Sequence, residues 1–272
     1  MASDPNPKSQ QSIGKKLGIS RQLANYHLHK TLGFKTVHKT KCHRLTEVAM
    51  DQRKRRSWPL YLRLNNDGWR KFITSDEALF RLDESSGQTK IQYLRSDQSR
   101  SEAEPFIHRE HSKSVMVWVA MSANGLSRPL FIDSNVKINH QVYIDKVLKP
   151  FIRVDLPKLY PDGDYVFQQD SAHSHRSNKV AQFLKEKKIK YLPPQEWMAN
   201  SPDAAPCDYF LWGYLKNRLS RQRITDVHKL KLAIRREIKS VPIEFIQNAM
   251  KSWPSRCRKI YESNGANIEH KR

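Results

Sequence analysis

One short span of the sequence restricts the fold more than any other. Residues 165–169 form an apolar run that predicts a strand, the spacing of apolar residues over 177–185 predicts a helix, and residues 189–192 predict a second strand. A strand, a helix and a strand joined so closely form a right-handed parallel crossover. The chain is therefore expected to be an α/β protein.

A second group of predicted strands lies earlier in the chain. Residues 69–75 predict a short strand, residues 115–120 a strongly buried strand, and residues 129–133 a strand that returns after a turn at Gly125. These three strands fit an antiparallel meander, and residues 141–151 then predict an amphipathic helix. Meander and crossover together predict a mixed sheet flanked by helices.

Acidic side chains follow two of these strands, and another opens a helix. Asp76 follows the first strand of the meander, Asp170 ends the first strand of the crossover, and turn residues 200–206 lead into a helix beside Asp208. The carboxyl ends of adjacent strands in such sheets face a common crevice. We favour Asp76 over Glu77 because neighbouring strand residues point to opposite faces, so only one can enter a given site.

Carboxylates that gather without a partner repel one another, and at least one pKa rises. A divalent cation removes that cost, and Mg²⁺ prefers hard oxygen ligands while keeping several waters. Two such ions about 3.5–4 Å apart can activate the attacking oxygen and stabilise the leaving oxygen of a phosphodiester. On the residues alone, a metal site and a set of caps and turn formers are about equally supported.

The charge of the chain points to its partner. A formal net charge of +22 and a pI near 10.0 indicate a polyanion, usually nucleic acid. No run of about 18 apolar residues is present, so no membrane span is expected. The three cysteines are scattered and give no zinc-binding spacing.

The first sixty residues are the most basic part of the chain, with 13 Lys or Arg against 3 Asp or Glu. Residues 9–17 and 21–31 predict two helices, with Gly18 ending the first and Ser20 capping the second. This pattern is typical of a helix-turn-helix, whose second helix enters the major groove. The side chains that it would present to DNA are Arg21, Gln22, Asn25 and His29. An ordinary helical hairpin is the alternative, and the basic flanks favour DNA.

Residues 46–68 are expected to form a basic linker, with a helix as the alternative over residues 46–58. It contains a dense cationic block made of Arg53, Lys54, Arg55 and Arg56. Such a block can contact the phosphate backbone or act as a nuclear import signal, which predicts a nuclear protein. A solvated charged face is an equally good interpretation of any single residue in it.

Four stretches of the sequence carry a resemblance to a known family. Residues 72–80, 115–125, 166–175 and 200–219 read FITSDEALF, VMVWVAMSANG, VFQQDSAHSH and NSPDAAPCDYFLWGYLKNRL. Together they resemble the mariner branch of the DDE/D transposases, over about residues 9–272.

The resemblance implies an RNase H-like catalytic domain that uses Mg²⁺ or Mn²⁺, with two ions expected. It makes Asp76, Asp170 and Asp208 the catalytic, metal-binding carboxylates, with Asp203 as the rival for the third. His175 matches the histidine that follows the second aspartate in the family, where it either assists the metal site, contacts DNA or is simply packed.

The resemblance also predicts the organisation and activity of the chain. Residues 1–45 would be an incomplete helix-turn-helix segment, because the family usually carries two such units, and residues 69–272 the DDE/D catalytic domain. The expected function is cleavage of double-stranded DNA at transposon terminal inverted repeats and strand transfer into target DNA, by a homodimer. The alternatives are a domesticated DNA-binding protein without catalysis and a nuclease acting on RNA–DNA hybrids.

Overall fold

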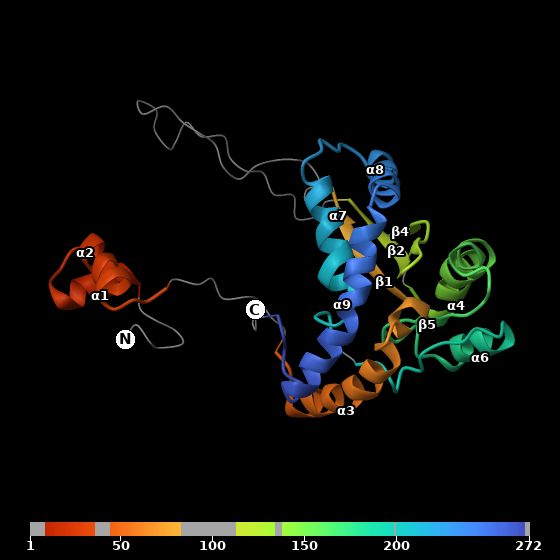
Figure 1. The fold of residues 1–272 in the computed structure, drawn as a ribbon. Coiled ribbons are helices and arrows are strands. Elements are labelled where there is room, and N and C mark those ends of the chain that lie inside the picture. Colours follow the sequence, from red (N-terminus) through yellow and green to blue (C-terminus); the bar gives the residue numbers. More distant parts are fainter. Residues whose placement is uncertain (1–8, 36–43, 83–112, 134–137, 199, 270–272) are drawn as a thin grey trace. The chain divides into compact units, whose positions relative to one another are not determined.

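The computed structural model describes residues 9–35, 44–82, 113–133, 138–198 and 200–269 (Figure 1). The chain divides into two compact units, residues 1–41 and residues 42–272, and each is described by itself.

The first unit is a pair of short helices. Helix α1 spans Gln10–Leu17, and α2 spans Arg21–Tyr26 and continues as the π-helical turn η1, His27–Thr31. The hydroxyl of Ser20 caps α2 by accepting a hydrogen bond from the backbone N–H of Leu23. Gly18 ends α1 in the left-handed region, at a φ of 68°. Both predicted helices and the turn between them are confirmed.

The second unit is built on a mixed sheet. Its strands are β1 (Phe72–Arg81), β2 (Ser114–Ser122), β3 (Gly125–Leu126), β4 (Leu130–Asp133) and β5 (Val166–Gln168). Strand β1 pairs antiparallel with β2 and parallel with β5, and β2 pairs antiparallel with both β3 and β4. The predicted meander, crossover and α/β class are confirmed. The strand expected over residues 189–192 is reduced to one parallel bridge between Tyr191 and Phe167.

Strand β1 is longer than the sequence predicted, and the difference matters for the site. Its antiparallel pairing with β2 continues as far as Arg81, whereas its parallel pairing with β5 stops where Thr74 faces Gln168. Asp76 therefore lies inside β1, not at its end. It stands just beyond the point at which β1 loses its parallel neighbour.

Helices cover both faces of this sheet. One face carries α3 (Glu47–Leu64), η2 (Gly68–Lys71), η6 (Cys207–Leu211), α7 (Trp212–Leu219), α8 (Val227–Lys239) and α9 (Ile243–Glu262). The other carries α4 (His140–Tyr143), η4 (Ile144–Leu148), η5 (Phe151–Asp155), α5 (Leu156–Leu159) and α6 (Asn178–Glu186). Figure 1 shows α7 and α9 on one side of β1 and β2 and α4 on the other.

The alternation of side chains along β2 produces two cores. Val117 and Val119 belong to the core beneath α7, α8 and α9, while Trp118 and Ala120 belong to the core beneath α4, α5 and α6. None of the helices in the described ranges combines the length and apolarity that crossing a bilayer requires.

The segment expected to be a basic linker is largely a packed helix. Helix α3 lies against α9, and its buried residues include Leu60 and Leu64, which join the core beneath the sheet. This helix is part of the second unit.

Candidate active site

A cavity of about 440 Å³ opens where β1 and β5 stop pairing. Its lining residues come from β1, from the segment after β5, and from the turn and helix around residue 208. They are Thr74, Ser75, Asp76, Gln168, Asp170, Ser171, Ala172, Arg176, Trp197, Asn200, Ser201, Pro202, Ala205 and Asp208. The three aspartates predicted from the sequence thus line one cavity.

The register of the parallel pair explains why two of them meet. Thr74 faces Gln168, and the hydroxyl of Thr74 donates to Oε1 of Gln168 over 2.6 Å. The hydroxyl of Ser75 donates to the carbonyl oxygen of Gln168 over 3.2 Å. Two residues farther along each segment come Asp76 and Asp170, and residues two apart in a strand share a face.

Asp208 reaches the cavity from η6, and its charge acts on Asp76. Burial, followed by the charge of Asp208, raises the pKa of Asp76 to about 8. The indole Nε1 of Trp212 partly offsets this by donating to Oδ2 of Asp76 over 2.6 Å. Trp212 follows Asp208 by four residues, so the two share a helix face.

These contacts fit a divalent cation. The carboxylate of Asp76, whose ionisation is disfavoured by burial and by the charge of Asp208, lines one cavity with those of Asp170 and Asp208, and such groups are the hard oxygen donors that Mg²⁺ and Mn²⁺ accept. A bound cation would remove the repulsion that raises the pKa of Asp76. The role of Asp76, Asp170 and Asp208 as ligands stays a prediction.

A histidine supports Asp170 from behind the cavity. Nδ1 of buried His175 lies 2.5 Å from Oδ1 of Asp170, and Nε2 lies 3.2 Å from Oε1 of Glu77. Burial lowers the pKa of His175, but the interactions with Asp170 and Glu77 outweigh it and raise the pKa to about 10. The ring also packs on Tyr143, at 4.0 Å between centroids.

Glu77, Asp170 and His175 offer ligand atoms within 4.8 Å of one another, so they also could hold a metal ion. Sequence reasoning set Glu77 aside because it points away from the face of Asp76. The structure gives that opposite face its own acidic group, joined to the cavity through His175. The alternation of side chains along β1 indicates that Glu77 faces away from Asp76. Nothing in the sequence, however, places His175 beside Glu77.

The rival third carboxylate is engaged elsewhere. Both oxygens of Asp203 accept hydrogen bonds from Arg53, at 2.9 Å and 2.7 Å. Asp203 is buried and does not line the cavity, whereas Asp208 does.

The cationic block of α3 requires a correction. Arg53 has no exposed surface, so the expectation that it contacts DNA is wrong: its guanidinium is used in the interior of the second unit. Arg56 donates to the carbonyl oxygen of Trp197 and Lys54 lies over the ring of Tyr261. Only Arg55 stands on an exposed face, paired with Asp51.

The four candidate DNA contacts of the first unit differ in the hydrogen bonds that their side chains already make within the protein. Arg21 and Gln22 are exposed at the start of α2. Asn25 is exposed but accepts a hydrogen bond from Gln10, and Nδ1 of His29 lies 2.7 Å from the carbonyl oxygen of Phe34. Contact with DNA by these four stays a prediction.

The raised pKa of Asp76 predicts a pH-dependent stability in metal-free buffer. Asp76 ionises near pH 3.8 in the unfolded chain but near pH 8 in the folded chain. Its contribution to stability is complete below pH 3.8 and is lost as the pH rises towards about 8, because unfolding then releases a proton. Asp76→Asn removes this titration and keeps an acceptor for Trp212.

We therefore expect Asp76→Asn to melt at a higher temperature than the wild type near pH 8 in EDTA, and at a similar temperature below pH 3.8. Mg²⁺ should raise the melting temperature of the wild type near pH 8 more than that of the variant. Thermal unfolding followed by circular dichroism measures both effects. Equal melting curves at the alkaline end would contradict the burial and repulsion described for Asp76.

The fold and the cavity together define a fold class. A mixed sheet in which β1 lies between β2 and β5, with carboxylates reaching one cavity from β1, from beyond β5 and from a later helix, is the RNase H-like fold that the sequence predicted. Structures of the Mos1 transposase share this fold. Its paired-end complex with the left transposon end matches at a TM-score of 0.81 and 22% identity, covering 98% of this chain and 77% of that one.

Comparison of sequences is more specific than comparison of folds. The chain is 32% identical over 212 residues to the Tc3 transposase of Caenorhabditis elegans, a match that covers 76% of this chain and 60% of that protein. It is 24% identical over 264 residues to the Tc1 transposase of the same organism, covering 97% of this chain and 89% of that protein. No family model matches the sequence. In sequence the chain is therefore similar to the Tc1, Tc3 and mariner transposases.

Proposed function

We propose that this protein is a DNA transposase that cuts DNA at transposon ends and joins those ends to target DNA, with Asp76, Asp170 and Asp208 as its catalytic carboxylates. The observation that carries the proposal is the meeting of these three side chains in one cavity, from three distant parts of the chain. Its relatives are transposases, which supports the reaction class.

The three carboxylates would hold two ions of Mg²⁺ or Mn²⁺. Divalent cations at such a site lower the pKa of the attacking water and offset the charge on the leaving oxygen. Solved structures of the Mos1 transposase paired-end complex with Mn and with Mg support the choice of metals. His175 would hold Asp170 in place through its contact with that carboxylate.

The reaction needs no covalent intermediate with the protein. Water attacks a phosphodiester at the transposon end and releases a 3′ hydroxyl, and that hydroxyl then attacks a phosphodiester of the target. The chain's part is to bring both DNA strands to the cavity and to hold the carboxylates in position, which is how most enzymes of phosphoryl transfer act.

The partner would be double-stranded DNA: terminal inverted repeats bound by the first unit, and target DNA. The net charge of +22 supports this, as do complexes of the Mos1 transposase with transposon ends. A homodimer would pair the two ends, and the protein would work in the nucleus.

The test is nicking of DNA by the purified full chain. The substrate carries the inverted repeats that flank the gene, and the control duplex has the same composition in scrambled order. We expect nicks at the repeat ends in Mg²⁺ or Mn²⁺ and none in EDTA. Binding with a steep salt dependence but no nicking under any metal would reject the enzymatic proposal and leave a DNA-binding protein.

A further inference from the structure

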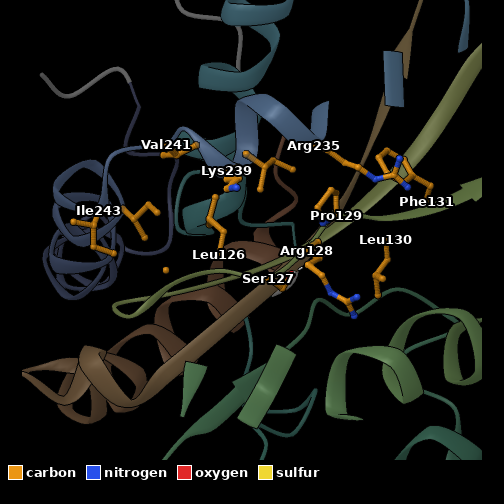
Figure 2. Close-up of a pocket in the computed structure, with 13 residues that line it drawn as sticks. Leu126, Ser127, Arg128, Pro129, Leu130, Phe131, Arg235, Lys239, Val241 and Ile243 are labelled. Carbon is orange, nitrogen blue, oxygen red and sulfur yellow. Dashed lines mark hydrogen bonds between the residues drawn. The ribbon is translucent and has the colours of Figure 1, made fainter. Parts of the chain in front are cut away.

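A second cavity, of about 750 Å³, lies away from the aspartates (Figure 2). It is bounded by residues 125–131 of the sheet edge on one side and by the end of α8 and the start of α9 on the other. We call it the edge groove. Its volume is in the range of ligand sites, about 300–1,000 Å³.

The edge groove has an apolar floor. Leu126 from β3, Ile238 from α8 and Ile246 from α9 line it, and Val241 joins them from the turn between the two helices. Ile243 also lines it and keeps 38% of its surface exposed. This floor offers an apolar side chain a place to lose its contact with water.

The rim of the groove is cationic. Arg128, Arg235 and Lys239 line it, and none of the thirteen lining residues is acidic. Arg128 is paired with Asp155, which neutralises it in part. Arg235 lies over the ring of Phe131, at 4.8 Å from its centroid. Among the carboxylates whose side chains the structure describes, none pairs with Arg235 or Lys239. Figure 2 shows Arg235 and Lys239 on the same side of the groove, above Leu126.

The groove runs beside an open sheet edge. Within the part of the chain that the structure describes, β3 and β4 pair with β2 alone. An edge of this kind leaves backbone N–H and C=O groups that an extended peptide can pair with, while neighbouring pockets take its side chains. Pro129 has no N–H, so such pairing is restricted to β4, Leu130–Asp133.

We propose that the edge groove binds an acidic segment of a partner protein, in extended form. A bulky apolar side chain of that segment rests on Leu126 and Ile238, and flanking carboxylates face Arg235 and Lys239. Charge complementarity selects the occupant, because the groove holds cations without acids. DNA fits less well, because its phosphates would contact the cationic rim and the apolar floor would stay exposed to water.

The proposal does not depend on the DNA chemistry of the other cavity. The full chain is used to select binders from a display library of random peptides. We expect enrichment of sequences that combine Asp or Glu with Leu, Ile, Phe or Trp. A fluorescent copy of the most enriched peptide is then titrated by anisotropy with the wild type and with two charge-reversal variants.

The variant R235E/K239E is expected to bind that peptide at least about tenfold more weakly. The matched control K185E/K187E reverses two exposed charges near the end of α6 and should bind as the wild type does. Ile243→Ser tests the floor at an exposed position and should also weaken binding. Melting curves of all variants establish that they are folded.

Three results would overturn the proposal. One is the absence of an acidic, apolar consensus among the selected peptides. Another is peptide binding that is unchanged in R235E/K239E. Displacement of the peptide by a short duplex DNA, equally from the wild type and from K185E/K187E, together with loss of DNA binding in R235E/K239E, would likewise overturn the proposal and make the groove a DNA contact.

Discussion

Asp170→Asn is expected to eliminate metal-dependent nicking while leaving the affinity for DNA almost unchanged. The substitution keeps the size of the side chain and removes the charge that a divalent cation needs. The loss should exceed about 100-fold, because even outer partners of metal ligands change affinity or activity by about 10- to 100-fold. Nicking of end-bearing DNA in Mg²⁺, followed on denaturing gels, measures the loss, and a gel shift measures DNA affinity.

The matched control is Asp162→Asn, an exposed turn aspartate that precedes β5 and lies outside the cavity. It removes the same charge and should nick at the wild-type rate. A variant Asp170→Asn that nicks at the control's rate would remove Asp170 from the catalytic set. Calorimetric titration with Mn²⁺ adds an independent measure, since Asp170→Asn should bind the ion more weakly than Asp162→Asn.

The same assay separates the two candidates for the third carboxylate. Asp208→Asn should lose nicking as Asp170→Asn does, without a loss of stability. Asp203→Asn should instead lower stability, because it weakens the interaction with Arg53 in the interior. A stable, inactive Asp203→Asn beside an active Asp208→Asn would reverse our choice.

The meeting of Asp76 and Asp170 could be anticipated because the residues beyond the paired ends of adjacent parallel strands face a common crevice. Asp170 follows an apolar strand, and Asp76 meets it through the parallel register of β1 and β5. The length of β1 could not be anticipated in the same way. It depends on pairing with β2, which lies more than thirty residues later in the chain. The sequence around Asp76 contains no signal for that partner.

The burial of Arg53 shows a different limit. A run of four cations suggests an exposed face, yet the buried positions of α3 are Arg53, Ser57, Leu60 and Leu64, which follow helical spacing. That spacing could have placed Arg53 on the inward stripe. What the sequence could not supply is the partner, because Asp203 lies 150 residues away and Gly265 lies 212 residues away.

Arg53→Met is expected to cost the second unit about 3–5 kcal/mol of unfolding free energy, since it leaves the carboxylate of Asp203 buried without its cation. Removing the guanidinium also takes donors from the carbonyl oxygens of Gly265 and Asn200. Urea denaturation at neutral pH measures the change. Arg55→Met, an exposed neighbour on the same helix, is the control and should cost less than about 1 kcal/mol.

A double variant tests whether the charge of Asp203 is the cause. Arg53→Met with Asp203→Leu removes both ions, and replacing a whole buried pair by apolar groups is often neutral. We expect the double variant to recover much of the stability lost by Arg53→Met alone, although the carbonyl partners stay unsatisfied. If both variants are equally unstable, the cost lies in packing and those carbonyl groups and not in an unpaired carboxylate.

The ion pair of Arg53 and Asp203 also links the stability of the second unit to the position of residues that line the active-site cavity. Arg53 donates to the carbonyl oxygen of Asn200 over 3.0 Å and to the hydroxyl of Ser201 over 2.6 Å, and both residues line the cavity of the aspartates. Arg53→Lys keeps the charge but cannot make the paired hydrogen bonds to Asp203. It should remain folded and bind DNA as the wild type does, yet nick more slowly. Unchanged nicking in folded Arg53→Lys would show that the loop of Asn200 and Ser201 holds its position without this anchor.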